Sequence, residues 1–370
     1  MKKLPWFLLA LICSTVLGCG DGDSGFDPND PITPIGRIEG YVLNSDFGGD
    51  IGVSRVDPTT GELVAVAGSP FATSGVAQNV ALSPGGRFVY APLRGDDALE
   101  AFSLEPSTGA LTPLAGFPRQ TVQDGFATVA ANGRYLYVAG ESEIDGFRCD
   151  ETSGGLTRLA GFPLAVPGML NAQTQKFGPT GQTLYVADRD SDQIFVFSLD
   201  ANSGALTLQG QVASGGDGPT ALALSTAGDY LLAAHADGTL VNFQFTSGGG
   251  LVQMAGPTTV YADAPALTYR MDVVNDVVYL GNGSDGTLNA FRINIAGTLV
   301  PVGGFPRAGG GASVLTFPFP YAPFLYSSDR NANRIYGYLP TANGSLNSVP
   351  NSPFGGTGQP TYLESAVVGY

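Results

Sequence analysis

The sequence predicts an all-β protein of seven equivalent units, because one tripeptide recurs at a nearly fixed interval and each copy lies between short apolar runs. The tripeptide is Gly-x-Leu, and its glycines are Gly61, Gly109, Gly154, Gly204, Gly249, Gly297 and Gly344. Successive glycines lie 48, 45, 50, 45, 48 and 47 residues apart, and a period in this range indicates a repeat architecture. The 53 glycines and 26 prolines suit a chain with frequent turns. Seven β units of this size predict a seven-bladed β-propeller with four antiparallel strands per blade.

Residues 1–18 are predicted to be a signal peptide. Lys2 and Lys3 precede an apolar stretch, residues 4–17, which is shorter than the about 20 residues that a membrane-spanning helix needs. The stretch Val16-Leu17-Gly18-Cys19 resembles a bacterial lipoprotein signal, in which the cysteine is lipidated and becomes the new N-terminus. We expect a lipid anchor at Cys19, with ordinary secretion or an uncleaved anchor as alternatives. The protein would then be extracytoplasmic, on the outer membrane or cell surface if the source has an outer membrane.

The rest of the chain divides into a tether, residues 19–35, and the propeller, residues 36–370. The tether is rich in Gly, Asp and Pro and has little to bury, which is typical of a flexible linker. The chain carries 17 Lys and Arg against 32 Asp and Glu, a net charge of −15, which argues against a nucleic-acid partner. Membrane contact is therefore expected only through Cys19, and we expect a monomer. With Cys13 lost in the signal peptide, Cys149 is the one cysteine left for the propeller, so no internal disulfide is predicted.

Aligning the units places aromatic residues in register in two strands of each blade. The second strand carries Tyr41, Tyr90, Tyr137, Tyr185, Leu232, Tyr279 and Tyr326, and the third carries Phe102, Phe147, Phe197, Phe243, Phe291 and Tyr338. We interpret both series as packing between blades, because each blade interface needs one large apolar residue. Cys149 falls at the third-strand position of Leu104 and Leu199, which predicts a small buried hydrophobe.

The two ends of the chain predict how the ring closes. The first unit begins with a second strand, at residues 40–43, and the chain ends with a first strand, at residues 361–368. We therefore expect the C-terminal strand to complete the N-terminal blade as its innermost strand.

One position of the first strand is predicted to form a level of the channel wall. Its occupants are Ala81, Thr128, Lys176, Ala223, Arg270, Phe317 and Glu364. In the functional hypothesis, Lys176 and Arg270 hold an anionic ligand and Glu364 acts as general base. The alternatives are a solvated pore in which Glu364 balances two cations, or a blade interface with buried ion pairs.

Two further candidates lie in the turns after the second strands. His235, the only histidine, is a candidate base at the end of one such strand, although no Ser-His-Asp or Cys-His set can be built around it. Of the 32 acidic residues, 13 lie in or beside these turns, which could attract a cation or a basic partner. Asp188, Asp190 and Asp192 alternate as in a calcium loop but lack its glycine and distant glutamate, and they remain candidate metal ligands. No cofactor is expected.

Three phrases resemble the lactonase-type, 6-phosphogluconolactonase-like family of seven-bladed propellers. They are Gly116-Phe117-Pro118, the stretch from Leu82 to Tyr90 and the stretch from Phe197 to Leu206, and the likeness extends over residues 36–370. The resemblance implies a lactone hydrolase with His, Arg and Glu around the channel mouth. The family places His after Gly-Pro at the start of first strands, whereas here Gly218-Pro219 is followed by Thr220. We therefore interpret the protein as an anchored binding or scaffold module with a small-molecule or protein ligand at the channel mouth. Lactone hydrolysis is the alternative.

Overall fold

The structure is a computed structural model that describes most of the predicted propeller. It describes residues 38–46, 48–129, 133–261, 268, 270–311, 313–316, 323–356 and 358–369. The predicted signal peptide, the tether and Cys19 lie outside the described residues, as does Phe317. Among the described residues, none belongs to a helix long and apolar enough to cross a membrane.

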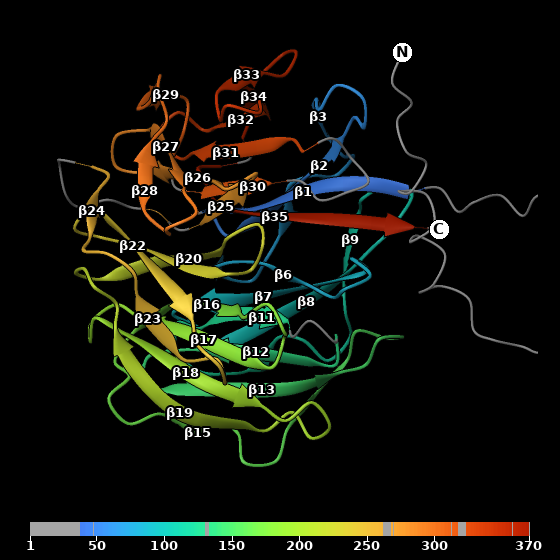
Figure 1. Ribbon diagram of the computed structural model, residues 1–370. Coiled ribbons are helices and arrows are strands. Elements are labelled where there is room, and N and C mark those ends of the chain that lie inside the picture. Colours follow the sequence, from blue (N-terminus) through green and yellow to red (C-terminus); the bar gives the residue numbers. More distant parts are fainter. Residues whose placement is uncertain are drawn as a thin grey trace, which may run out of the picture. The chain divides into compact units, whose positions relative to one another are not determined.

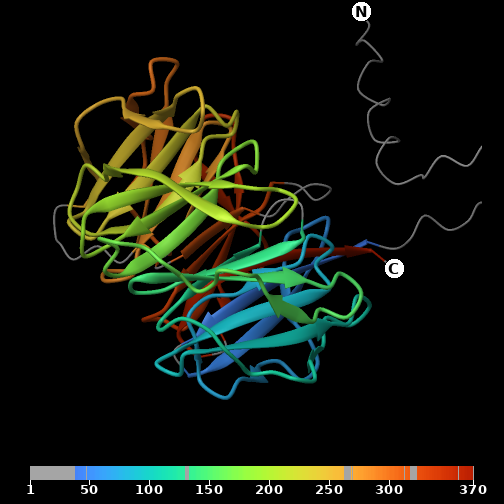
Figure 2. The ribbon, with the colours of Figure 1, turned by 90° about the horizontal axis from the view of Figure 1, so that it is seen from below.

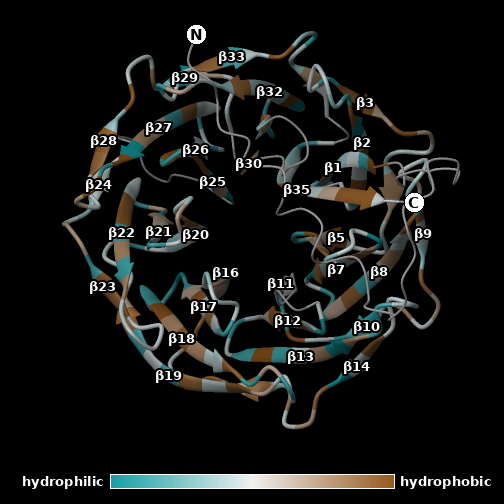
Figure 3. Cartoon of the chain, turned by 45° about the vertical axis from the view of Figure 1, so that its right-hand side comes forward, coloured by the Kyte–Doolittle hydropathy of each residue, from teal (hydrophilic) through white to brown (hydrophobic). Residues whose placement is uncertain are grey.

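Seven antiparallel sheets surround a central channel, as Figure 3 shows in a view along the channel. In each sheet the order from the centre outward is first, second, third and fourth strand. The first strands are β35 (Pro360–Gly369), β5 (Val76–Ala77) with β6 (Ala81–Leu82), β11 (Phe126–Val129), β16 (Ala172–Phe177), β20 (Pro219–Leu224), β25 (Met271–Val274) and β30 (Ser313–Thr316). In this order we number the blades 1 to 7. The seven-bladed all-β fold predicted from the repeat is confirmed.

The remaining strands follow in the same blade order. The second strands are β1 (Ile38–Asp46), β7 (Phe88–Arg94), β12 (Tyr135–Ala139), β17 (Thr183–Asp188), β21 (Tyr230–His235), β26 (Val277–Asn282) and β31 (Leu325–Asp329). The third strands are β2 (Asp50–Val56), β8 (Ala98–Leu104), β13 (Glu143–Cys149), β18 (Gln193–Leu199), β22 (Thr239–Phe245), β27 (Thr287–Ile293) and β32 (Arg334–Pro340).

The outer edge of each blade is irregular. The fourth strands are β3 (Leu63–Ala65), β9 (Leu111–Pro113), β14 (Leu156–Arg158), β19 (Leu206–Ala213), β23 (Leu251–Gln253), β28 (Leu299–Pro301) and β33 (Leu346–Ser348). In every blade except blade 4 a further short strand pairs with the third. These are β4 (Phe71–Ala72), β10 (Arg119–Gln120), β15 (Leu164–Ala165), β24 (Thr258–Thr259), β29 (Arg307–Ala308) and β34 (Phe354–Gly355).

The ring closes through the two ends of the described chain. β35 pairs antiparallel with β1 along its length, from Ile38 opposite Gly369 to Asp46 opposite Pro360. Figures 1 and 2 both show the red β35 beside the blue β1. The expected completion of the N-terminal blade by the C-terminal strand is confirmed, so blade 1 depends on residues from both ends of the sequence.

The glycine of each Gly-x-Leu occupies a turn that suits no other residue. All seven glycines have positive φ, between 71° for Gly154 and 87° for Gly344, a region that L side chains rarely adopt. The neighbouring blade also leaves little room, because a Cβ at Gly204 would lie 2.6 Å from the ring of Tyr135. Each leucine then begins a fourth strand, as predicted.

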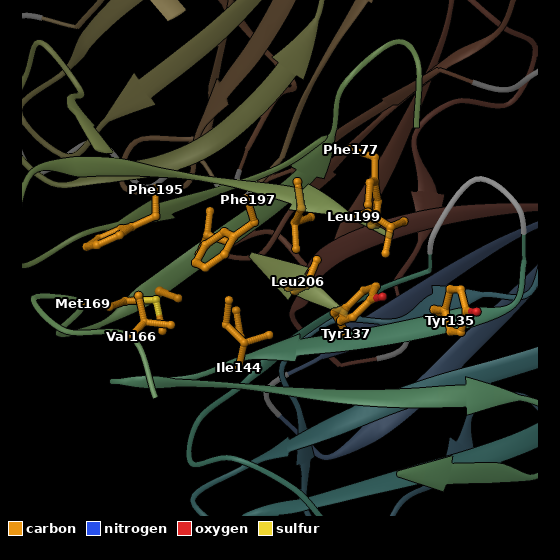
Figure 4. Packing of buried hydrophobic residues seen from close by; sticks show 14 residues of the cluster. Tyr135, Tyr137, Ile144, Val166, Met169, Phe177, Phe195, Phe197, Leu199 and Leu206 are labelled. Atoms are coloured by element: carbon orange, nitrogen blue, oxygen red, sulfur yellow. The ribbon is translucent and has the colours of Figure 1, made fainter. Parts of the chain in front are cut away.

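The second-strand tyrosines hold adjacent blades together. They are almost fully buried, and Tyr137 and Tyr326 donate their hydroxyls to the carbonyls of Gly204 and Gly61 in the next blade, each at 2.7 Å. In blade 5 the position is Leu232, and Asn242 instead donates to Gly297 O at 2.6 Å. Figure 4 shows Tyr137 packed with Phe177, Phe197 and their neighbours between blades 3 and 4. The predicted packing role is confirmed, and the tyrosine hydroxyls add a hydrogen bond that was not predicted.

Cys149 is a free, buried cysteine. It is 8% exposed and packs in the apolar cluster between blades 2 and 3. Burial raises the pKa of its thiol to about 12, which keeps the reactive thiolate scarce at neutral pH. The prediction of a small buried hydrophobe is confirmed.

Candidate functional site

Two cavities follow one another along the channel. The inner cavity, of about 310 Å³, is lined by first-strand residues of several blades, among them Ala81, Lys176, Arg270, Tyr362 and Glu364. The mouth cavity, of about 190 Å³, is lined by the beginnings of first strands and by residues at the ends of second strands. Phe126 and Tyr362 line both cavities, from blades 3 and 1. These two aromatic residues therefore mark the boundary between the mouth and the interior.

The structure brings three of the predicted channel residues into the inner cavity. Lys176 lies on β16, Arg270 directly precedes β25, and Glu364 lies on β35, so blades 4, 6 and 1 contribute one charged residue each. Ala81 of blade 2 lines the same cavity. Phe317 and the side chain of Thr128 lie outside the described residues. Ala81, Lys176, Arg270 and Glu364 thus face the channel, whereas Ala223 does not line this cavity and packs in the apolar cluster between blades 5 and 6.

Arg270 is held in place by several contacts with β35. Its Nη1 lies 2.7 Å from Glu364 Oε2 and donates to Leu363 O at 3.0 Å, and its guanidinium lies 5.5 Å from the centre of the Tyr362 ring. Burial is the largest single influence and lowers the pKa of the guanidinium, but Glu364, Tyr362 and Asp272 together outweigh it and raise this pKa above its ordinary value. The result is a fixed, permanently charged donor group in the cavity wall.

Both carboxylate oxygens of Glu364 are already engaged. Oε2 accepts the hydrogen bond from Arg270, and Oε1 accepts one from the backbone N–H of Ser365 at 3.0 Å. Each oxygen keeps a second lone pair, but the ion pair fixes the carboxylate against Arg270. The geometry therefore favours a positioning role for Glu364 over the predicted role as general base.

Lys176 contrasts with Arg270, because it makes no hydrogen bond or ion pair with any residue that the structure describes. Burial lowers the pKa of its ammonium and the positive charge of Arg270 lowers it further, while Asp272 and Glu364 act in the opposite direction. The net result is that the pKa of Lys176 lies below the ordinary lysine value. Asp272 was not identified from the sequence, although its place two residues after Arg270 puts both on the same face of a strand.

His235 lies away from the channel residues. It is 1% exposed, and its Nδ1 and Nε2 lie 3.3 and 3.1 Å from the carbonyl oxygens of Thr239 and Ser214. Burial lowers the pKa of its imidazole. His235 lines neither the inner nor the mouth cavity.

His235 occupies a position that holds a buried polar residue in three other blades. It ends β21, and the corresponding ends of β17, β26 and β31 are Asp188, Asn282 and Asp329, which are also buried. Each of these three accepts a hydrogen bond from a backbone N–H of the following turn. In these three blades the polar residue caps the turn, whereas the ring nitrogens of His235 face carbonyl oxygens. Aligning the ends of the second strands would have indicated a structural role for this position from the sequence.

Two of the three candidate calcium ligands also accept hydrogen bonds from the backbone, and the third accepts one from a side chain. Asp188 accepts from the N–H groups of Leu170 and Asn171, at 2.8 and 2.6 Å, and Asp192 accepts from Gly218 N at 2.6 Å. Asp190 accepts from the side-chain amide of Asn171 at 3.1 Å. Within the described residues, no group of three or more His, Cys, Asp or Glu side chains is placed to hold a metal ion. The alternation of these aspartates is accounted for by turn geometry.

Three charged residues at the channel mouth were missed by the sequence analysis. Arg94, Glu141 and Arg189 are exposed, line the mouth cavity, and have side chains without a hydrogen bond or ion pair to other described residues. Each follows its second-strand tyrosine by four residues. Aligning the repeats would therefore have placed these three charged residues at one equivalent position. The mouth thus has two cations among the acidic residues that were predicted for this face.

Comparisons with known proteins identify the same kind of propeller. The family model described as "Lactonase, 7-bladed beta-propeller" matches residues 48–171 and 126–262. A candidate 6-phosphogluconolactonase from Bacteroides fragilis superposes with a TM-score of 0.73 at 19% identity, over 91% of this chain and 100% of that one. The periplasmic gluconolactonase of Pseudomonas aeruginosa superposes with a TM-score of 0.67 at 17% identity, over 90% and 100%. No curated protein matches the sequence significantly. At these identities the superpositions show a common fold.

Proposed function

Since the chain belongs to the lactonase family of seven-bladed β-propellers, we propose that it hydrolyses a lactone inside its central channel. The observation that carries this proposal is the convergence of Lys176, Arg270 and Glu364 on one cavity, from three different blades. A cavity of about 310 Å³ is at the lower end of small-molecule sites, which suits a single ring-sized ligand.

The arrangement supports the central requirement of lactone hydrolysis. Water attacks the ring carbonyl, negative charge develops on the carbonyl oxygen, and the acyl C–O bond of the ring then breaks to give a hydroxy acid. A donor that is already fixed where this charge develops stabilises the transition state without reorganisation. Arg270 is such a donor, because Glu364, Leu363 and Tyr362 hold its guanidinium.

The proposed substrate is an unphosphorylated sugar lactone outside the cytoplasm. The lipoprotein-like signal ending at Cys19 supports a lipid-anchored, extracytoplasmic protein, and phosphorylated sugar lactones are cytoplasmic metabolites. The similarity in fold to a periplasmic gluconolactonase supports the same substrate class. Arg94 and Arg189 at the mouth would interact with polar groups of the entering lactone.

The test is acid release from sugar lactones by the full-length chain purified in detergent, after subtraction of the spontaneous rate. We expect turnover of unphosphorylated lactones, and a loss of about 10²-fold in kcat for Glu364→Gln, because Arg270 loses its anchor. Glu151→Gln makes the same change at an exposed residue outside the two cavities and should leave the rate unchanged. Rates equal to background on phosphorylated and unphosphorylated lactones would contradict the proposal and favour the binding or scaffold module.

A further inference from the structure

The chain uses lysine in the propeller at one place only. It has 14 arginines but three lysines, and Lys2 and Lys3 belong to the predicted signal peptide. Every other cation from residue 4 onward is an arginine, which stays charged in proteins, whereas an ammonium can release its proton. The single exception, Lys176, lies in the inner cavity.

Lys176 is also the residue of this cavity that is best placed to accept a proton. Arg270 is permanently charged, and both oxygens of Glu364 accept hydrogen bonds. Gln175 donates its amide to the carbonyls of Phe126 and Tyr137, and the remaining polar lining residues carry hydroxyls and amides, which are poor bases. Lys176 has no hydrogen-bond or ion-pair partner among the described residues, so its nitrogen has a free lone pair whenever it is neutral.

The charges that face Lys176 come from two other strands. Arg270 and Asp272 belong to blade 6, and Glu364 belongs to blade 1 beside Tyr362. Burial and Arg270 lower the pKa of Lys176 more than Asp272 and Glu364 raise it. The neutral amine is therefore more abundant at a given pH than in an exposed lysine.

We propose that Lys176, as a neutral amine, is the general base that activates water for lactone hydrolysis, and that Glu364 serves to position Arg270. The inference rests on the proposed function. The amine lone pair takes a proton from water as the water oxygen bonds to the carbonyl carbon. The acyl C–O bond of the ring then breaks, and the proton passes from the ammonium to the ring oxygen that leaves, so that the hydroxy acid is released and the amine is restored.

The first experiment compares Lys176→Arg with Glu364→Gln in kcat/KM over a range of pH. Lys176→Arg keeps the positive charge but cannot act as a base, so we expect a loss of about 10²-fold or more. Wild-type kcat/KM should rise with pH through an inflection below the ordinary lysine value of 10.5. Glu364→Gln removes a charge that raises the pKa of Lys176, so its inflection should move to lower pH. Glu151→Gln should leave the inflection in place.

The second experiment measures the protonation of the Lys176 amine and does not depend on lactone turnover. The full-length Arg148→Lys variant adds a reference lysine at an exposed position of β13. Each lysine of this variant is labelled by reductive methylation with formaldehyde at a series of pH values. Mass spectrometry then gives the labelling rate of each lysine. We expect the half-maximal labelling rate of Lys176 at a lower pH than that of the introduced lysine. Equal values would overturn the inference.

The outcomes separate the two proposals. Lactone turnover that survives in Lys176→Arg would overturn the role of Lys176 as base and leave the hydrolase. Absence of turnover in the wild type would overturn both, even if Lys176 labels at low pH. Loss of turnover in Lys176→Arg, a shifted inflection in Glu364→Gln and labelling of Lys176 at low pH together support the inference.

Discussion

The second-strand position of the tyrosines and the first-strand position of the channel residues follow opposite rules. Six of the seven blades carry tyrosine at the second-strand position. The residues at the first-strand position all differ in kind except for two alanines: Ala81, Thr128, Lys176, Ala223, Arg270, Phe317 and Glu364. Each of these six tyrosines packs against the next blade, so the same residue solves the same packing problem six times. At the first-strand position, Ala81, Lys176, Arg270 and Glu364 line one shared cavity, each from a different blade. Regularity in this repeat therefore indicates support of the fold, and departure from it indicates residues available for a site.

The largest expected effect comes from removing residues 360–370. Without β35, blade 1 loses its innermost strand and its pairing with β1, and the channel loses Tyr362 and Glu364. We expect loss of the whole fold, measured as the absence of a cooperative transition in thermal unfolding followed by circular dichroism. A soluble truncated protein that unfolds cooperatively would contradict this expectation.

The next largest loss of stability is expected for Gly204→Ala, which tests the contacts between blades. Gly204→Ala combines a φ of 78° with a Cβ 2.6 Å from the Tyr135 ring, and we expect a loss of about 3 kcal/mol in the free energy of unfolding by urea. Gly116→Ala is the matched control, because its φ is 84° but a Cβ there would meet nothing within 4 Å. It should cost about 1 kcal/mol. Equal losses would show that backbone strain alone makes glycine necessary at this turn.

A smaller effect is expected from the hydroxyl that joins blades 3 and 4. Tyr137→Phe leaves Gly204 O without its 2.7 Å hydrogen bond, which should cost about 1 kcal/mol in the free energy of unfolding. Tyr336→Phe removes a hydroxyl that bonds to no described residue and should change it by less than about 0.5 kcal/mol. If the two variants lose the same amount, the contribution of the tyrosines is packing rather than hydrogen bonding.

An effect of similar size but opposite sign is expected in the channel. Lys176→Met removes a cation without an ion-pair partner among the described residues, and we expect the free energy of unfolding at pH 7 to increase by about 1 kcal/mol. Because the folded pKa of Lys176 is lowered, the wild type gains stability as the pH rises through that pKa, so the advantage of the variant should shrink in alkaline solution. A variant that is less stable than wild type at pH 7 would indicate that Lys176 supports the fold.

Much of the fold was predictable because its determinants are local. Gly-x-Leu marks a turn with positive φ and the start of the fourth strand, and the aromatic register marks the blade interfaces. The exception in blade 5 was not predictable, since Asn242 takes over the hydrogen bond that Leu232 cannot make. The mouth residues Arg94 and Arg189 could have been found by aligning the ends of the second strands.

The sequence by itself determined the number of blades, the strand order within each blade and the way the ring closes, because short-range turn and strand preferences recur in every repeat. It also placed Lys176, Arg270 and Glu364 at one level of the first strands. Only the tertiary structure decided that these three residues face the channel, that Glu364 is bound to Arg270, 94 residues away, and that Lys176 has no such partner among the described residues. These facts depend on closing the ring, which brings side chains of different blades into one space.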